Sequence, residues 1–311
     1  MNRKVATVSC HRLAAWVLCV LSCTIPAGFA GATGGNSAPF RIGFSSAMFT
    51  DVNENDAKAA IKIWGEQVGR ERNISIDPDP LILRDTNSAL HALRENQVDA
   101  VGITTIEYHQ LRRDIDFSPV FLTYHAGAWT EQYLVLTHRE GPVKTLADLG
   151  GRRLVVHQNA RASLAPLWLD TLLHRQGHPP AARFTARIEA ASKLSGTVLP
   201  VFFRQMDACL ATRSGFETMD ELNPQLARQL IILGESPAVV PALFAFRTNY
   251  HSPYKADIIA GVNALRNTPA GRQVLIIFQS DDIAEKPLSI LESALELIEK
   301  HERIVKEAPS P

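Results

Sequence analysis

The stretch RENQVDAVGITT, residues 94–105, decides the fold, because a second stretch, residues 204–212, repeats its plan. In both, a helix end and a tight turn lead into an Asp-Ala strand, and a threonine follows five places after the aspartate. The two pairs are Asp99 with Thr104 and Asp207 with Thr212. Each unit follows an earlier strand with a polar end, Ser45-Ser46 in one case and His157-Gln158-Asn159 in the other. Two matched strand ends in the same order predict two similar α/β lobes.

The chain around these repeats alternates short apolar strands with amphipathic helices from Phe40 onward. Apolar residues recur at helical spacing over 57–68 and 164–172, and again over 290–305 near the C-terminus, whereas 154–156 reads as a strand. Such alternation is typical of α/β domains in which helices connect parallel strands. We therefore predict a mostly parallel sheet, flanked by helices, in each lobe.

The N-terminus has the parts of an export signal. Arg3, Lys4 and Arg12 precede an apolar run over 13–25, and Pro26 interrupts that run before a group of small residues. We predict a signal peptide over 1–30, cleaved near Ala30, a flexible Gly/Ser-rich leader over 31–39, and a periplasmic location. Val20 to Cys23 loosely resembles a lipobox, so a lipid anchor at Cys23 is the alternative.

Charge and cysteine content exclude two classes of protein. The chain has 32 basic and 32 acidic side chains, and loss of the signal leaves a formal charge of −3. A nucleic-acid-binding surface needs concentrated positive charge, so we expect no nucleic-acid partner. Cys209 is the one cysteine after the signal, which rules out an intramolecular disulfide, and the fold must depend on its hydrophobic core.

Polar residues gather at the predicted strand ends, which is where open α/β sheets bind ligands. Hydroxyl, amide and guanidinium groups dominate there, and backbone N–H groups at helix N-termini add positive potential, so the site suits a small oxyanion. The candidate ligand-binding residues are Ser45, Ser46, Thr104, Thr105, Gln158, Asn159, Arg161, Ser163, Ser195, Thr197 and Thr212.

Two of these candidates also have a purely structural interpretation. Proline is tolerated only in the first turn of a helix, so the helix that contains Pro166 is expected to begin at Ser163. By the same argument, the helix that contains Pro200 is expected to begin at Thr197. Ser163 and Thr197 are then either ordinary N-caps or caps that also present free N–H groups to a ligand. The sequence leaves both interpretations open.

The order of four segments resembles the phosphate, phosphite and phosphonate receptors of ABC transporters, within the type II periplasmic-binding superfamily. These segments are RIGFSS, SALHALRENQVDAVGITT, YLVLTHREGPVKTLADLGGRRLVVHQN and SGTVLPVFFRQMDACLAT, and they cover most of residues 40–250. The chain departs from the family in the turn over 158–163, which lacks the usual Ser/Thr-rich sequence with glycine. The ligand is therefore expected to be a phosphonate or another small anion.

The resemblance implies a two-lobed type II fold joined by two hinge strands. We expect lobe one to comprise 40–128 plus 238–311, including the last helices, and lobe two to comprise 129–237. The crossings then lie near 129–133 and 234–240, from which Trp129, Glu131 and Gln132 can reach the ligand.

The predicted function is a periplasmic solute-binding receptor that delivers a small oxyanion to an ABC permease. The alternative is a sensing subunit for a membrane kinase or cyclase. Enzyme activity is the less favoured reading, because the sequence has no nucleophile elbow, zincin motif, P-loop or dinucleotide fingerprint. His125, His138 and His157 lack metal-ligand spacing. We expect a monomer with no metal, no cofactor and no catalytic residue.

Overall fold

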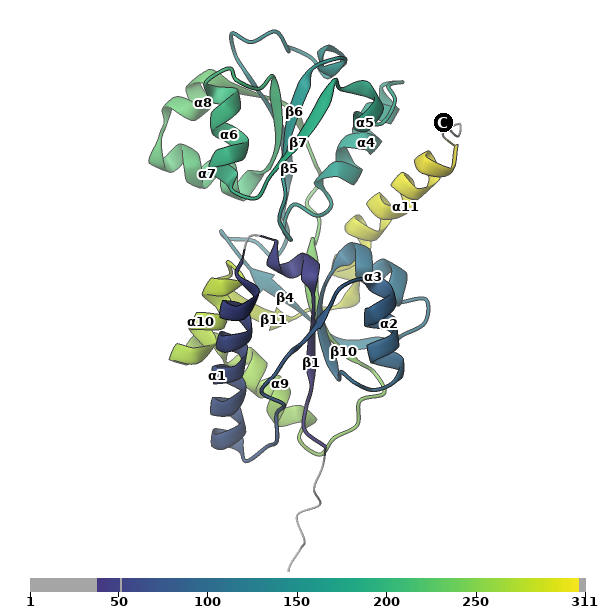
Figure 1. Cartoon of the computed structure of the whole chain (residues 1–311), viewed down its shortest axis with the longest axis vertical. Coiled ribbons are helices and arrows are strands. Elements are labelled where there is room, and N and C mark those ends of the chain that lie inside the picture. The colour runs from purple at the N-terminus through teal and green to yellow at the C-terminus, as the bar shows by residue number, and fades with distance from the viewer. Residues whose placement is uncertain (1–37, 51, 308–311) are drawn as a thin grey trace, which may run out of the picture. The chain divides into compact units, whose positions relative to one another are not determined.

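The computed structural model describes residues 38–50 and 52–307. The predicted signal peptide, most of the leader and Cys23 lie outside the described residues. The described chain forms two separate β-sheets, each with helices on both faces (Figure 1). This arrangement confirms the prediction of a two-lobed α/β fold.

The first sheet has six strands in the order β11-β4-β10-β3-β1-β2. Strand β1 pairs in parallel with β2 and β3, whereas β10 runs antiparallel to both β3 and β4, and β11 is antiparallel to β4. The strands are β1 Ile42–Ser45, β2 Leu81–Leu83, β3 Ala100–Thr104, β4 Phe117–Tyr124, β10 Ala242–Arg247 and β11 Asp282–Glu285.

Two hydrophobic clusters cover the faces of this sheet. Helices α1 Glu54–Arg72, α9 Lys255–Asn263 and α10 Pro269–Ile277 cover one face, with η3 Leu265–Asn267 between the last two. Helices α2 Thr86–Arg94 and α3 Thr105–Leu111 cover the other (Figure 1). Asn53 caps α1 by accepting hydrogen bonds from the N–H groups of Asn55 and Asp56. A short 3₁₀ helix, η1 Ser46–Phe49, follows directly from β1.

The second sheet has five strands in the order β7-β6-β8-β5-β9, with β6 parallel to both β7 and β8 and with β5 antiparallel to β8 and β9. One face packs against α4 and α5, and the other against α6, α7 and α8. The elements are β5 Tyr133–His138, η2 Ala147–Leu149, β6 Arg153–His157, α4 Ala165–Arg175, α5 Ala181–Phe184, β7 Arg187–Ala191, α6 Leu194–Phe202, β8 Ala208–Thr212, α7 Arg213–Leu222, α8 Gln225–Gln229 and β9 Leu230–Glu235.

In the described sheets, four of the six strands of the first and four of the five strands of the second run in one direction, which confirms the prediction of mostly parallel sheets; β10, β11 and β5 run the opposite way. The antiparallel strands include β5 and β10, which are the first strands to enter a sheet after each crossing between the sheets. A strand that arrives without the crossover helix of a βαβ unit is not constrained to be parallel to its neighbour. Helical spacing on either side of a strand therefore gave no information about these directions.

The predicted repeat has a structural counterpart at the start of each sheet. Asp99 accepts a hydrogen bond from the Arg41 N–H (2.9 Å) at the start of β1, and Asp207 accepts one from the Arg153 N–H (2.8 Å) at the start of β6. Each arginine side chain also pairs with the same aspartate. Both aspartates follow by three places a residue with positive φ, which closes the tight turn. The two lobes are therefore built by the same local device.

The two crossing segments lie side by side and pair with each other. The N–H of Glu131 donates to the carbonyl of Val239 (2.7 Å), and the N–H of Val239 donates back to Glu131 (2.9 Å). The last helix, α11 Glu292–Glu307, follows η4 Leu288–Leu291. Its apolar side chains Ala294, Leu297 and Ile298 belong to the core that α4 shares with the second sheet. The sequence analysis had assigned α11 to lobe one.

In the part of the chain that the structure describes, every helix is too short or too polar to cross a membrane.

Candidate functional site

Four of the eleven candidate residues line one cavity of about 460 Å³. Thr104 comes from the end of β3 in the first sheet, whereas Gln158, Asn159 and Ser163 come from the turn that follows β6 in the second. Ala47 and Thr50, in and after η1, complete the side of the first sheet. The structure thus brings strand ends from both sheets to one cavity, whose polar groups at these strand ends lie among mostly apolar wall residues such as Leu154, Leu169 and Leu210.

The turn over 158–164 is held by its own backbone and by Asn159. The N–H of Ala162 donates to Asn159 Oδ1 (2.8 Å), and the N–H of Ser163 donates to the carbonyl of Ala160 (3.3 Å). Asn159 is buried, so its side chain shapes the turn at the cavity wall. The hydroxyl of Tyr133 donates to the carbonyl of Arg161 (2.9 Å) from inside the second core. Its own burial raises the pKa of Tyr133, which keeps this donor protonated.

Ser163 does not cap a helix, so that interpretation was wrong. Helix α4 begins at Ala165 with Leu164 in the capping position, and the Ser163 hydroxyl donates to the carbonyl of Pro241 (3.2 Å). The cap is lost because the chain is already coiled through the turn, whereas a capping serine needs extended backbone. Pro166 does lie in the first helical turn, as expected.

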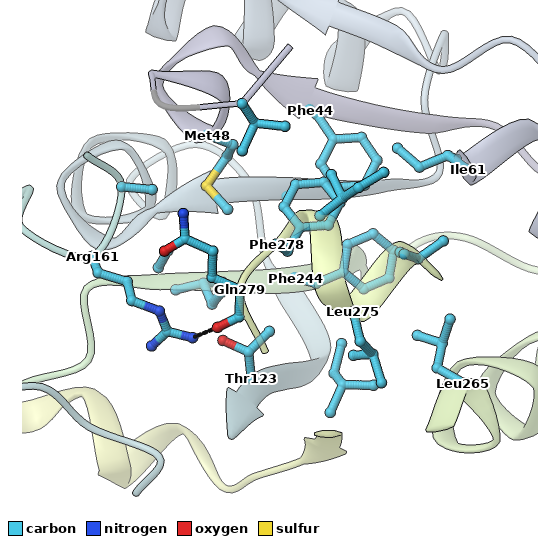
Figure 2. A pocket seen from close by; sticks show the side chains of 18 of the residues that line it. Phe44, Met48, Ile61, Thr123, Arg161, Phe244, Leu265, Leu275, Phe278 and Gln279 are labelled. Atoms are coloured by element: carbon cyan, nitrogen blue, oxygen red, sulfur yellow. Dashed lines mark hydrogen bonds between the residues drawn. The ribbon is translucent and has the colours of Figure 1, made fainter. Parts of the chain in front are cut away.

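Arg161 extends from this turn to a segment of the first lobe. Its Nη2 donates to the carbonyl of Gln279 (3.0 Å) and lies 3.2 Å from Ser280 Oγ, just after α10 (Figure 2). His125 lies close by. Burial, with the positive charge of Arg161, lowers the pKa of His125 below its usual value.

Ser45 and Thr104 share one carboxylate, that of Glu107. The Ser45 hydroxyl donates to Glu107 Oε1 (2.5 Å), and both the N–H and the hydroxyl of Thr104 donate to Glu107 Oε2 (2.9 Å each). Thr104 and Glu107 form a capping box at the start of α3, which the Thr-x-x-Glu spacing could have revealed. The carboxylate of Glu107 therefore occupies the hydroxyls of Ser45 and Thr104, which the sequence analysis had assigned to binding an anion.

The remaining candidates do not line this cavity. Ser46 Oγ donates to the carbonyl of Arg84, and the buried Thr105 hydroxyl donates to that of Val240. Thr197 is buried inside α6 and donates to Lys193, so its predicted capping role was also wrong, because α6 begins at Leu194. Ser195 is exposed in the first turn of the same helix. Thr212 is the buried residue before α7 and makes no side-chain cap.

The crossing segments carry a buried carboxylate, that of Glu131. Glu131 accepts hydrogen bonds from the Ser214 hydroxyl (2.5 Å) and from the Gln132 N–H (3.1 Å). Gln132 in turn donates to Glu235 and to the carbonyl of Ser236. These two side chains tie the crossings to the start of α7. Within 38–50 and 52–307, no group of three or more histidine, cysteine, aspartate or glutamate side chains is arranged to hold a metal ion.

A second cavity, of about 110 Å³, is lined in part by the Asn159–Arg161 turn, from which Arg161 is labelled in Figure 2. Asn159 and Ala160 line both cavities. Its walls come mainly from the first lobe, and they are aromatic and aliphatic. Phe44 stacks on Phe278 with ring centroids 5.3 Å apart and on Phe244 at 6.2 Å. No signal in the sequence pointed to this cavity.

Comparison with known proteins identifies the family. The family model for periplasmic substrate-binding proteins of phosphonate ABC transporters matches residues 47–286. The chain belongs to this family. Its members are transport proteins that bind solutes in the periplasm, and the family is not one of enzymes. No curated protein matches the chain.

Solved structures share the fold at low identity. XAC2383 from Xanthomonas citri, solved bound to ATP, is 18% identical with a TM-score of 0.63, and the match covers 88% of this chain and 100% of that chain. PA3383 from Pseudomonas aeruginosa, a binding protein component of an ABC phosphonate transporter, is 14% identical with a TM-score of 0.60, covering 86% and 88%. PhnD1 from Prochlorococcus marinus, in complex with methylphosphonate, is 11% identical with a TM-score of 0.56, covering 86% and 98%. These likenesses show the two-lobed fold.

Proposed function

We propose that this chain captures a small oxyanion of the phosphonate, phosphate or phosphite type in the cavity of about 460 Å³ and delivers it to an ABC permease. The observation that carries the proposal is the shared lining of this cavity, with Thr104 from one sheet and the 158–163 turn from the other. A ligand held by both contributes contacts that neither lobe can make alone. Such contacts bias a two-lobed receptor toward its ligand-bound arrangement.

The charges favour one side of the cavity for the anion. Glu107 already accepts the hydroxyls of Ser45 and Thr104, and its carboxylate repels a second negative group. The 158–163 turn instead carries Gln158 and Asn159 and lies next to the Arg161 guanidinium, and the carboxylate of Asp170 in the cavity lining already accepts from the Ala181 N–H and pairs with His301. We therefore place the oxyanion against this turn. Methylphosphonate bound to PhnD1 and ATP bound to XAC2383 are both anions on the same fold, which supports this ligand class.

The lobe boundaries are part of the same proposal. Lobe one comprises 40–128 plus the segment from 238 onward, lobe two comprises 129–237, and the paired crossings near Glu131 and Val239 act as the hinge. Helix α11 contacts the core of lobe two as well as α3, so it tethers the lobes outside the hinge. The family is one of transporters, which favours a permease over a sensor kinase or cyclase as the membrane partner.

Calorimetry with phosphate, phosphite, methylphosphonate, sulfate and small carboxylates tests the proposal. A hydrogen bond to a charged ligand contributes about 1.5–3 kcal/mol, so Arg161→Gln and Asn159→Ala are each expected to weaken binding by about ten- to hundredfold. Arg175→Gln is the matched control, because it removes the same charge from an exposed position at the far end of α4. Absence of binding across the whole anion panel would overturn the proposal.

A further inference from the structure

The cavity of about 110 Å³ has the composition of a binding site for an amphipathic ligand. Among the described residues that line it, Arg161 is the only ionisable side chain, and it lies at the mouth with Thr123 and Gln279 (Figure 2). The interior is formed by buried apolar side chains, including Phe44, Ile61, Trp64, Leu265 and Leu275. One end of the cavity is therefore cationic and the rest is apolar.

We infer that this cavity receives the apolar tail of an anionic ligand whose head group binds at the Asn159–Arg161 turn. The inference rests on the proposed function, since it takes the head group to be the oxyanion, and it extends that function to alkyl- or arylphosphonates and related amphipathic anions. Asn159 and Ala160 line both cavities, so a head group at this turn lies at the entrance to the apolar one.

The size of the cavity fits a tail. One water needs roughly 10–15 Å³ of such volume, and an engineered apolar cavity of about 150 Å³ stays dry and binds benzene. At about 110 Å³, this cavity matches a short alkyl chain or a small ring. Water gains few hydrogen bonds against walls of phenylalanine, leucine and isoleucine, so an apolar group meets little competition for the space.

The mouth adds further features that suit an anionic head. Trp129 lines the cavity, and Lys286 Nζ lies 3.9 Å from the centroid of its ring, so a second cation stands near the entrance. Gln279, Met48 and Arg161 are not buried, whereas the floor residues are. The polar end is thus the accessible end, and a ligand enters tail first with its charge left at the turn.

The test is a homologous series of phosphonates, from methyl- through butyl- to octylphosphonate, with phenylphosphonate as the ring member, measured by calorimetry on the whole protein. Burial of a methylene contributes about 0.8 kcal/mol, so the dissociation constant is expected to fall by about fourfold for each methylene until the cavity is full. Alkylsulfonates and alkylcarboxylates of equal length identify the preferred head group. Uncharged alcohols of equal length measure what the anionic head contributes.

Two neighbouring residues of α10 provide matched variants. Leu275 is buried in the cavity wall and Ile276 is 66% exposed to solvent, so Leu275→Phe fills the cavity while Ile276→Phe adds a similar bulk to the surface. Leu275→Phe is expected to abolish the dependence on tail length, and Ile276→Phe to retain it. Thr123→Leu, which narrows the mouth at a half-buried position, replaces Leu275→Phe if that variant does not fold.

The outcomes separate this inference from the proposed function. If methylphosphonate binds and longer tails bind no tighter, the inference is wrong and the oxyanion receptor stands. If alcohols bind as tightly as phosphonates of equal length, the assignment of an anionic head group to the Asn159–Arg161 turn is wrong as well. If tail length matters equally in Leu275→Phe and in the unmodified protein, the tail lies elsewhere. A length dependence that is lost only when the cavity is filled supports the inference.

Discussion

Asp99 and Asp207 hold equivalent places in the two sheets, so replacing each by asparagine compares a buried carboxylate that pairs with two arginines with a more exposed one that pairs with a single arginine. The Asp99 side chain is 2% exposed, and it pairs with Arg247 at 2.7 Å, which is 10% exposed, and with Arg41 at 3.3 Å. The Asp207 side chain is 17% exposed, and its partner Arg153, at 3.4 Å, is 49% exposed. Asparagine keeps the shape and an acceptor for the backbone N–H, and it removes the charge.

The expected costs differ severalfold. Breaking a buried pair costs about 3–5 kcal/mol, because the remaining charge stays buried without compensation. Arg247 still donates to the carbonyls of Val98 and Asn249, so we expect Asp99→Asn to cost about 3 kcal/mol, at the lower end of that range. An exposed pair contributes about 0.2–1 kcal/mol, which is the cost expected for Asp207→Asn.

Urea unfolding at neutral pH, followed by circular dichroism, measures both free energies of unfolding. Added salt screens exposed charges more than buried ones, so it should reduce the cost of Asp207→Asn and leave that of Asp99→Asn nearly unchanged. Equal costs for the two variants, or a strong salt effect on Asp99→Asn, would refute the argument from burial.

Three further predictions concern single positions near or beneath the cavities. A Cβ on Gly102 would lie 2.4 Å from the Phe44 ring, so Gly102→Ala is expected to cost about 1–3 kcal/mol, and an unchanged melting temperature would contradict the packing of that ring. The pKa of His125 is lowered from its usual 6.5, so its contribution to stability is present above that pH and is lost as the pH falls below it. His125→Gln should therefore lose less melting temperature on acidification than the unmodified protein does, and equal losses would count against this assignment. Burial raises the pKa of the Cys209 thiol, so thiol reagents should modify it only as the protein unfolds, and rapid labelling of the folded protein would show that it is accessible.

Local signals explain most of what could be predicted from the sequence. The repeat around Asp99 and Asp207 predicted two lobes, because an equivalent aspartate follows the tight turn and anchors the neighbouring strand in both. The reversed directions of β5 and β10 could not be predicted, since they depend on how the chain crosses between the sheets, which no short segment encodes.

The candidate site was predictable only in part, for a related reason. Strand ends bring Thr104 and Asn159 to one cavity, and strand ends can be located in a sequence. The roles of Ser163 and Thr197 depended on where each helix begins, and an error of one or two residues turned both into incorrect caps. The residues of the apolar cavity are spread from Ile42 to Ile283 and have no common pattern, because only the folded chain brings them together.

The apolar cavity also bears on how a ligand would draw the two lobes together. The cavity of about 110 Å³ has mostly apolar walls, so burying an apolar tail there is favourable by about 0.8 kcal/mol for each methylene. A tail in this cavity gains that energy within lobe one, while the head group contacts the 158–163 turn of lobe two. A ligand shifts an equilibrium only by its difference in affinity for the two states. A head at Arg161 and a tail beside Phe44 supply such a difference, because both contacts form together only when the turn meets the mouth of the cavity.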